Sequence, residues 1–313
     1  MRPFDWSSPV VLAGDGLGDR PQVLGRVPPG GLDFAQTFGP LHPGQGDPCV
    51  YRGPRDFWRA SWTPEGAGTL HLFVRGDRVG ARAFGPGALW LLDRARGAAS
   101  LLDRPERFAP REPRFLRLRG GVRGLRLGRT ASVLDTLLPT ILGQRVKVVE
   151  ARRSWIRLVR AFDARAPGPA PLWMPPEPRR VLRTPSWMFA AHGVDRTRAG
   201  TFVAVCRHAA RLLSVDGREL VDLLRRIRGI GPWTLAHVRL SHLGDPDAVV
   251  VGDYNLPHAV GRFFTGAPRS SDEEMLRHLE PYAGQRARAV RWIKASGVKR
   301  VRFGPRTPLR LAP

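Results

Sequence analysis

The chain lacks the features that define several other classes of protein. Its 313 residues include only two cysteines, Cys49 and Cys206, which lie far apart and favour buried thiols over a disulfide. No apolar run approaches the length of a membrane span. Residues 1–6 carry no signal-peptide core, so we expect the protein in the cytoplasm.

Metal-ligand patterns are missing as well. The eight histidines form no close pair with ligand spacing, and His237 and His242 would lie on different sides of a helix. Because no ligand pattern is present, we expect no catalytic metal. The sequence also shows no internal repeat.

Acidic residues are scarce relative to basic ones. The chain has 51 Lys and Arg against 27 Asp and Glu, a formal net charge of +24. Residues 104–129 hold nine Arg and two Glu, and residues 285–313 hold nine basic residues and no acidic one. Arginine-rich coding is an alternative explanation for the charge. Its clustering nevertheless predicts a polyanionic partner, bound in a salt-dependent way.

The first third of the chain is expected to form an arm and a mixed domain. Residues 1–30 are rich in Gly and Pro without periodicity, which predicts a loose arm. Residues 69–74 and 78–84 alternate in polarity across Gly76-Asp77 and predict a β-hairpin, whereas residues 88–102 look helical. We therefore place an α+β domain over residues 31–110.

Helical periodicity dominates the rest of the chain. Residues 133–142 present an apolar helical face that ends at Gly143-Gln144-Arg145, and seven prolines mark a loop over residues 164–185. Val203, Cys206, Ala210 and Leu213 again repeat at helical spacing. We expect a helical domain over residues 111–295, with a cleft between its two halves, and a basic tail over residues 296–313.

The most informative segment surrounds two glycines. It predicts a helix, a tight hairpin with positive φ at Gly229 and Gly231, and a second helix near Trp233 with Pro232 in its first turn. Free N–H groups and the positive end of a helix dipole meet at such a hairpin, which favours a phosphate oxygen. The first helix carries an apolar stripe of Leu220, Leu223, Leu224 and Ile227. The predicted phosphate contacts are Arg228, Gly229, Gly231 and Thr234.

The carboxylate of Asp253 follows this hairpin along the chain. Asp253 comes directly after the apolar residues 248–251 and Gly252, which predicts a carboxylate at the rim of a cleft. Helix capping is the alternative, because Asp is a preferred N-cap and a helix is expected from Leu256 to Phe264. With the hairpin upstream, we favour a catalytic role.

These motifs together resemble the helix-hairpin-helix DNA glycosylases, in particular the 3-methyladenine DNA glycosylase II branch. The matching segments are L-x-x-I-x-G-I-G-P-W-T-x-A from Leu224, V-x-V-G-D-Y around Asp253, I-L-G-Q-x-V around Gln144 and G-x-x-x-x-R-A from Gly193. Their order and spacing agree with that branch. The resemblance covers roughly residues 31–295 and is strongest over residues 130–260.

The resemblance implies a fold and an activity. It implies an N-terminal TBP-like domain of a sheet packed against helices, then a helical helix-hairpin-helix domain. The expected activity is base excision repair: a monomer flips a base from damaged double-stranded DNA and releases alkylated purines. Asp253 would stabilise the oxocarbenium-like transition state and orient a water. Excision of an oxidised or deaminated purine, or binding to DNA without catalysis, are the alternatives.

The resemblance also assigns the residues around the base. Where strand-cutting relatives carry a lysine that attacks C1′, this chain has Trp233, so we expect a monofunctional enzyme without lyase activity. Trp233, His237 and Trp187 are the predicted base pocket, although His237 stands where the branch usually has Tyr.

Two further roles follow from the same motifs. Arg145 stands where the branch often has a Leu that fills the gap left by the flipped base, and Gln144 is expected beside it at the DNA. Hairpin carbonyls near Ile227 and Gly229 would hold a monovalent cation. No organic cofactor is expected, and two cysteines cannot build the four-cysteine iron–sulfur cluster of some relatives.

Overall fold

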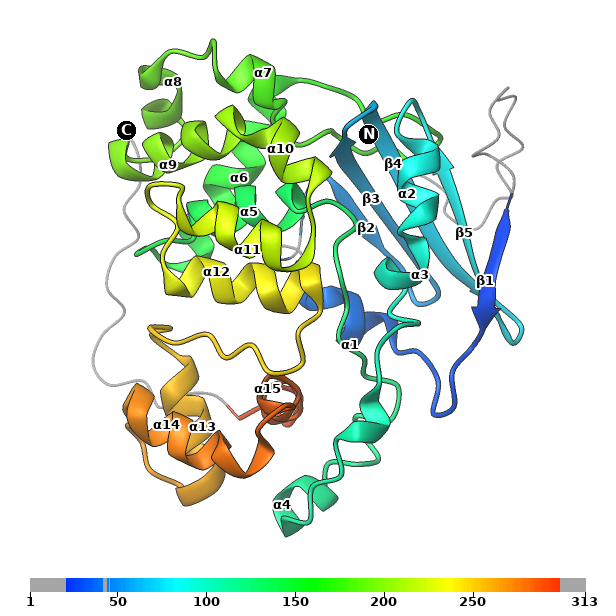
Figure 1. Cartoon of the computed structure of the whole chain (residues 1–313), viewed down its shortest axis with the longest axis vertical. Coiled ribbons are helices and arrows are strands. Elements are labelled where there is room, and N and C mark those ends of the chain that lie inside the picture. The colour runs from blue at the N-terminus through cyan, green and yellow to red at the C-terminus, as the bar shows by residue number, and fades with distance from the viewer. Residues whose placement is uncertain (1–20, 42–43, 45, 299–313) are drawn as a thin grey trace.

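A computed structural model of the chain describes residues 21–41, 44 and 46–298. It combines a five-stranded antiparallel sheet with groups of helices, so the predicted α+β class is confirmed (Figure 1). The sheet has the order β1-β5-β4-β3-β2, in which β2 to β5 are joined consecutively along the chain. The strands are β1 (Gln22–Arg26), β2 (Val50–Arg52), β3 (Asp56–Thr63), β4 (Gly66–Arg75) and β5 (Arg78–Phe84).

The central hairpin of the sheet agrees with the sequence pattern. Arg75 pairs with Arg78 across the turn, where Gly76 has φ +58°. The other three strands, β1, β2 and β3, escaped the sequence pattern. Gln22–Arg26 lie within the predicted loose arm but form β1, and residues 1–20 of that arm lie outside the described residues. In β3, Arg59 and Ser61 are buried and hide the apolar alternation that usually marks a strand.

The two faces of the sheet are covered by different parts of the chain. Phe57 belongs to the core under the short helices, whereas its neighbour Trp58 belongs to the opposite core with Leu172 and Met174. The proline-rich segment over residues 164–185 therefore lines the sheet, and the Trp62 indole donates to the carbonyl of Pro175 at 2.8 Å. The single helix predicted for residues 88–102 is two short ones. The helices over the first face are α1 (Phe34–Phe38), α2 (Ala88–Asp93) and α3 (Ala95–Ala98).

A second group of helices shares one large apolar core beside the sheet. The predicted stripe from Val203 to Leu213 is interrupted, because one helix ends at Arg207 and the next begins at Ala209. Ala210 is exposed as a result. The group comprises α5 (Leu134–Leu142), α6 (Val148–Phe162), α7 (Pro178–Val181), α8 (Ser186–Ala191), α9 (Arg196–Arg207), α10 (Ala209–Ser214), α11 (Gly217–Arg225) and α12 (Pro232–Val238), followed by a π-helical turn at Arg239–Leu243.

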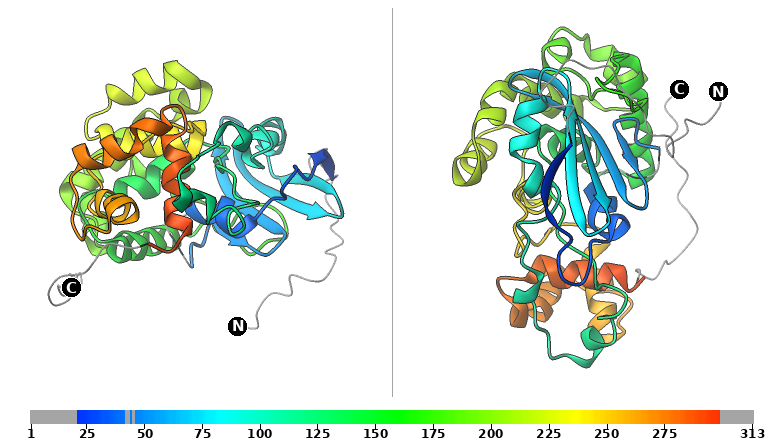
Figure 2. Two further views of the ribbon diagram at one scale, coloured as in Figure 1. Left: turned by 90° about the horizontal axis from the view of Figure 1, so that it is seen from below. Right: turned by 90° about the vertical axis from the view of Figure 1, so that its right-hand side faces the viewer.

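The last helices form a third group, set apart from the sheet in Figure 1 and in the right view of Figure 2. Phe115 of α4 lies in its core, so a segment that follows α3 packs with the helices near the end of the chain. The Arg288 guanidinium, 1% exposed, pairs with the Asp103 carboxylate and ties this group to the end of the sheet segment. The group comprises α4 (Pro113–Leu116), α13 (Leu256–Thr265), α14 (Asp272–Leu279) and α15 (Arg286–Ala295).

Short 3-10 turns lie at Gly39–Leu41, Pro105–Arg107 and Glu280–Tyr282. Among the described residues, no helix has the length and apolarity to span a bilayer. Of the predicted tail over residues 296–313, residues 299–313 lie outside the described part. The predicted domain boundaries stay predictions.

Candidate active site

The glycine hairpin lies between α11 and α12 and is shaped by one glycine in particular. Gly229 has φ +90°, and a Cβ there would lie 2.0 Å from the Thr201 Oγ1 of α9. Both the conformation and the close approach therefore require glycine. Gly231 differs from the prediction: its φ of −93° and ψ of −178° are extended. A Cβ at Gly231 would meet nothing within 4 Å, so this position faces open space.

The hairpin has a buried side and an exposed side. The predicted stripe is buried, and Pro232 begins α12 as expected. Arg228, Gly229 and Gly231 are exposed, and among the residues that the structure describes no side chain caps the first turn of α12. The exposed side thus offers unpaired N–H groups and an arginine, which suits the predicted phosphate contact. The buried stripe is Leu220, Leu223, Leu224 and Ile227.

Gln144 and Thr234 hold the hairpin from inside. The Gln144 Nε2 donates to the carbonyl of Gly229 and to the Oγ1 of Thr234, both at 2.9 Å. Thr234 is only 1% exposed, so its hydroxyl is not available to a phosphate in this conformation. A phosphate contact of Thr234 would therefore use its backbone N–H, and this contact stays a prediction. The Gln144 amide nitrogen is likewise turned to the hairpin.

The same hydrogen bond limits the predicted cation site. The Gly229 carbonyl accepts from Gln144, and the Ile227 carbonyl accepts from the Ile230 N–H at 3.1 Å. Each oxygen keeps one lone pair. The two carbonyls therefore fit a monovalent cation only if other ligands complete its shell, and no step of the chemistry depends on one.

The end of α5 is fixed by a buried arginine. Arg198, 6% exposed, donates to the carbonyls of Leu142 at 2.8 Å and Gly193 at 3.0 Å, and to the Asp195 carboxylate at 2.7 Å. The G-x-x-x-x-R-A motif is thus structural. It positions the turn that carries Arg145, which is exposed and has φ +57°. A non-glycine residue in that conformation costs free energy and marks a constrained position.

Two of the three predicted pocket residues lie together. The Trp233 and His237 rings meet edge to face with centroids 4.4 Å apart. A Cβ at Gly143 would lie 3.6 Å from the Trp233 Cη2, so the indole reaches from His237 to the end of α5. Trp187 is not brought to them: it is 70% exposed on α8, which packs on α9.

The two carboxylate oxygens of Asp253 have different surroundings. Its side chain is half-buried, and its Oδ1 accepts from the backbone N–H groups of Asn255 and Leu256, both at 2.8 Å. These bonds pair N–H groups at the start of α13, whose N-cap is Asn255, and fix the direction of the carboxylate. Within the described part of the chain, no donor is bonded to Oδ2. One oxygen thus caps the helix while the other stays available.

Three ionisable groups from different parts of the chain affect one another electrostatically. Burial and the positive charge of Lys294 lower the pKa of His237 to about 4, against the opposing effect of Asp253. The imidazole is therefore neutral at neutral pH. The pKa of Lys294 is also lowered, by the protein crowded around it and by Arg291, and Asp253 again opposes. Its side chain nevertheless stays exposed to water. No sequence motif marked Lys294 or Arg291.

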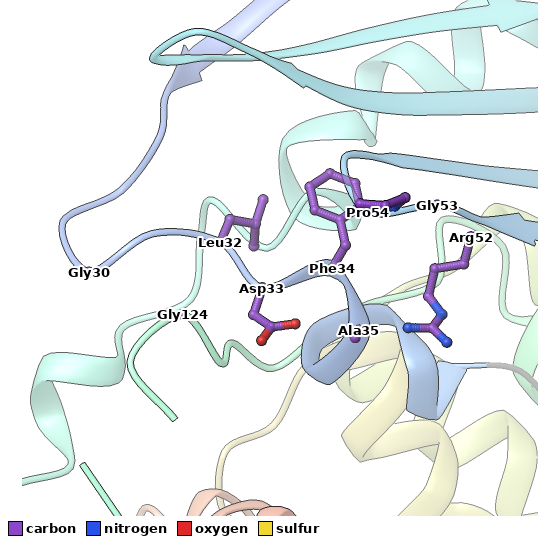
Figure 3. A pocket seen from close by; sticks show the side chains of 9 residues that line it. All are labelled: Gly30, Leu32, Asp33, Phe34, Ala35, Arg52, Gly53, Pro54 and Gly124. Atoms are coloured by element: carbon purple, nitrogen blue, oxygen red, sulfur yellow. The ribbon is translucent and has the colours of Figure 1, made fainter. Parts of the chain in front are cut away.

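Two cavities lie away from these residues. The larger, about 740 Å³, opens beside α1 and is lined by Asp33, Phe34, Arg52 and Pro54, among others (Figure 3). The Asp33 carboxylate there accepts from the Gln36 N–H and caps α1. A second cavity of about 350 Å³ lies between α10 and α11. Neither is lined by Asp253, Trp233 or His237, so the predicted cleft is not one of these two cavities.

The chain is similar to known proteins in sequence and in structure. No family model matches the chain. The chain is 26% identical over 166 residues to the Bacillus subtilis protein named "Putative DNA-3-methyladenine glycosylase YfjP", a match that covers 48% of this chain and 55% of that protein. The chain thus spans about half the length of the curated relative.

Solved structures extend the likeness to most of the chain. A 3-methyladenine DNA glycosylase from Archaeoglobus fulgidus matches with a TM-score of 0.71 at 18% identity, covering 88% of this chain and 97% of that one. The Clostridium acetobutylicum 8-oxoguanine glycosylase/lyase in complex with DNA matches with a TM-score of 0.63 at 12% identity, covering 85% and 91%. The chain therefore has the fold of the helix-hairpin-helix DNA glycosylases. The predicted resemblance to the 3-methyladenine branch is confirmed.

Proposed function

We propose that this protein is a DNA glycosylase of base excision repair that flips alkylated purines, of the 3-methyladenine type, and releases them by hydrolysis. The observation that carries the proposal is the setting of Asp253. One carboxylate oxygen is fixed by two backbone N–H groups, and the charge acts on His237, which lies against Trp233. A directed anion thus lies beside an aromatic pair.

This arrangement suits cleavage of an N-glycosidic bond. As the bond to the base breaks, positive charge develops on the deoxyribose, and a carboxylate held in place stabilises it without reorganising. The same carboxylate can orient the attacking water. An electron-poor alkylated base would stack on the Trp233 indole with a cation–π component. Arg145, exposed in its constrained turn, would fill the gap that the flipped base leaves.

Hydrolysis is favoured over a lyase reaction by the residue at the hairpin. Trp233 stands where strand-cutting relatives carry the attacking lysine, so water attacks C1′ and an abasic site remains. We propose a monomer with an N-terminal sheet domain over residues 31–110 and a helical domain over residues 111–295. It would work in the cytoplasm, at the nucleoid, without an organic cofactor. A monovalent cation at the Ile227 and Gly229 carbonyls is part of the same proposal.

The exposed hairpin would position the DNA. Its N–H groups and Arg228 contact phosphate and not bases, so they hold any sequence in register with Asp253. A glycosylase for an oxidised or deaminated purine, and a binding protein without turnover, remain the alternatives.

The test is release of free bases from methylated duplex DNA by wild type and Asp253→Asn. An asparagine Oδ1 still accepts the two N–H groups, so this variant removes the charge and keeps the helix cap. We expect a loss of about 10²–10³-fold in the rate of 3-methyladenine release, with DNA binding retained. Asp33→Asn, at another helix-capping aspartate, is the matched control. Wild type that binds DNA but releases no methylated base would refute the assignment.

A further inference from the structure

The turn that carries Asp253 is held by a second carboxylate from another helix. Gly252, which directly precedes Asp253, has φ +79°. Its N–H donates to the Oδ2 of Asp272 at 3.0 Å. Asp272 is the first residue of α14, which follows α13 along the chain. A side chain of α14 therefore reaches back to the peptide next to the candidate catalytic carboxylate.

The start of α14 is itself tightly fixed. The Ser271 hydroxyl accepts from the Glu274 N–H at 3.2 Å, and the Glu274 carboxylate accepts from the Ser271 N–H at 2.8 Å. The same carboxylate accepts from the Ser270 hydroxyl at 2.8 Å. Asp272 directly follows the Ser271 cap of this reciprocal pair, so its backbone is held in place.

Helix α13 holds the segment before α14 in turn. The Ser270 N–H donates to the His258 Nδ1 at 3.0 Å. A Cβ at Gly261 would lie 2.5 Å from the Ser270 Cβ, so α13 approaches this segment where it has no side chain. The two helices also pack on each other along their length. Asp272 is thus positioned by α13 as well as by its own helix.

These contacts close a loop around Asp253. The Asp253 side chain bonds to the start of α13, α13 holds the start of α14, and Asp272 of α14 returns to Gly252. The side chain of Asp253 is therefore fixed by α13 and the peptide before it by α14. A carboxylate that must face a developing charge acts best when nothing has to reorganise during the reaction.

Asp272 keeps its position at a cost. Its Oδ1 is buried and has no hydrogen-bond partner among the described residues. An unpaired buried oxygen lowers the free energy of unfolding and calls for an explanation. The exposed Glu273 already places a negative charge in the first turn of α14. The contact with Gly252 therefore explains the position of Asp272 better than the stability of α14 does.

We propose that Asp272 is a positioning residue for the reaction, which acts through Gly252 and fixes the direction in which Asp253 faces the deoxyribose. This proposal rests on the proposed glycosylase function. Asp272 takes no part in the chemical step itself. It supplies an acceptor oxygen to the Gly252 N–H, so the reaction needs that oxygen and does not need its charge.

A direct effect of the Asp272 charge is the competing role. A second carboxylate could stabilise positive charge on the deoxyribose by its own field, and removing the charge would then slow the reaction. Asparagine separates the two roles, because it keeps an acceptor oxygen for Gly252 and removes the charge. Alanine removes both.

The experiment measures single-turnover release of 3-methyladenine from methylated duplex DNA, with the protein raised until the rate constant no longer changes. In Asp272→Ala we expect this rate constant to fall about 10-fold, because a small misplacement of a catalytic group is costly. In Asp272→Asn it should stay within about twofold of wild type. Glu273→Ala, which removes a charge from the same turn and leaves the contact to Gly252, is the matched control and should also stay within about twofold.

A double variant tests whether Asp272 acts through Asp253. In the Asp253→Asn background, Asp272→Ala should slow the residual reaction less than about twofold, because the charge that Asp272 positions is already gone. An equal further loss in that background would overturn the proposal. The concentration of protein that half-saturates the rate should be the same for Asp272→Ala and wild type, since the contact positions the carboxylate and does not hold DNA.

The contrary outcomes have separate meanings. Asp272→Asn that is as slow as Asp272→Ala would replace the positioning role by a direct effect of charge. A wild-type rate constant that Asp272→Ala reaches only at higher protein concentration would leave a role in stability alone. Wild-type behaviour of Asp272→Ala refutes this inference and leaves the proposed function standing. Wild type that releases no methylated base refutes both.

Discussion

The Gln144 side chain donates a 2.9 Å hydrogen bond to the carbonyl oxygen of Gly229 and so joins the end of α5 to the hairpin. Its second amide hydrogen goes to the buried hydroxyl of Thr234. Two segments far apart in the sequence are thus held in one arrangement. The turn that carries Arg145 and the exposed hairpin therefore keep a set separation.

Replacing Gln144 should loosen this connection. In Gln144→Ala both acceptors lose their donor, and we expect a loss of about 1–3 kcal/mol in the free energy of unfolding. DNA affinity should fall with it, because the hairpin is no longer fixed to α5. Denaturant unfolding and fluorescence anisotropy with duplex DNA measure the two effects. Unchanged stability and affinity would show that the bridge is not needed.

The two hairpin glycines should respond in opposite ways. Gly229→Ala must adopt a positive φ and places a Cβ against Thr201, so we expect a cost of about 2–4 kcal/mol in stability. Gly231→Ala has an extended backbone and open space, so its stability should stay within about 1 kcal/mol of wild type. Its new methyl group faces the predicted phosphate and should weaken DNA binding. Thermal unfolding and binding assays on both variants separate folding from contact. Wild-type stability of Gly229→Ala would show that neither the positive φ nor the close approach to Thr201 requires glycine.

The sequence predicted the elements in which one local rule dominates. The sequence correctly predicted the turn at Gly76 and the helix end at Gly143. In both places a glycine directly follows residues whose apolar spacing is typical of a strand or a helix. β3 was missed because its Arg59 and Ser61 are buried through partners from distant segments: Arg59 donates to the Leu41 carbonyl, and Ser61 to Asp135. No local pattern reveals such pairs.

The site shows the same limit. Asp253 and Trp233 belong to recognisable motifs, whereas Lys294 lies in an ordinary helix, α15, and no motif marks its effect on Asp253 and His237. Spacing alone also did not show that the Thr234 side chain is buried and bonded to Gln144. Tertiary packing decides both cases.

Asp135 provides a test of the junction between the sheet and α5. Burial raises its pKa to about 6, against the opposing effects of Arg59 and of the 2.6 Å hydrogen bond from Ser61. The folded state therefore binds this proton more tightly than the unfolded state. The stabilisation that protonation of Asp135 gives the folded state is complete below about pH 4 and is lost as the pH rises through about 6.

We expect Asp135→Asn to remove this dependence. The variant should match wild type near pH 4 and be the more stable protein at pH 8, where wild type has to bury a charged carboxylate. Urea unfolding at several pH values measures the difference. A stability gap that does not change with pH would mean that Asp135 keeps one protonation state throughout.

Because Trp233 stands at the hairpin where strand-cutting relatives carry a lysine, we expect no lyase activity. We expect borohydride to trap no covalent adduct between the protein and DNA that contains an abasic site, because Trp233 cannot form a Schiff base. Lys294 makes this test sharp, since a lowered pKa is a property of an amine nucleophile. If an adduct does form, Lys294→Met and Lys147→Met should be compared. Loss of trapping in Lys294→Met alone would identify Lys294 as the nucleophile, and the protein would then be bifunctional through a lysine on α15 in place of one on the hairpin.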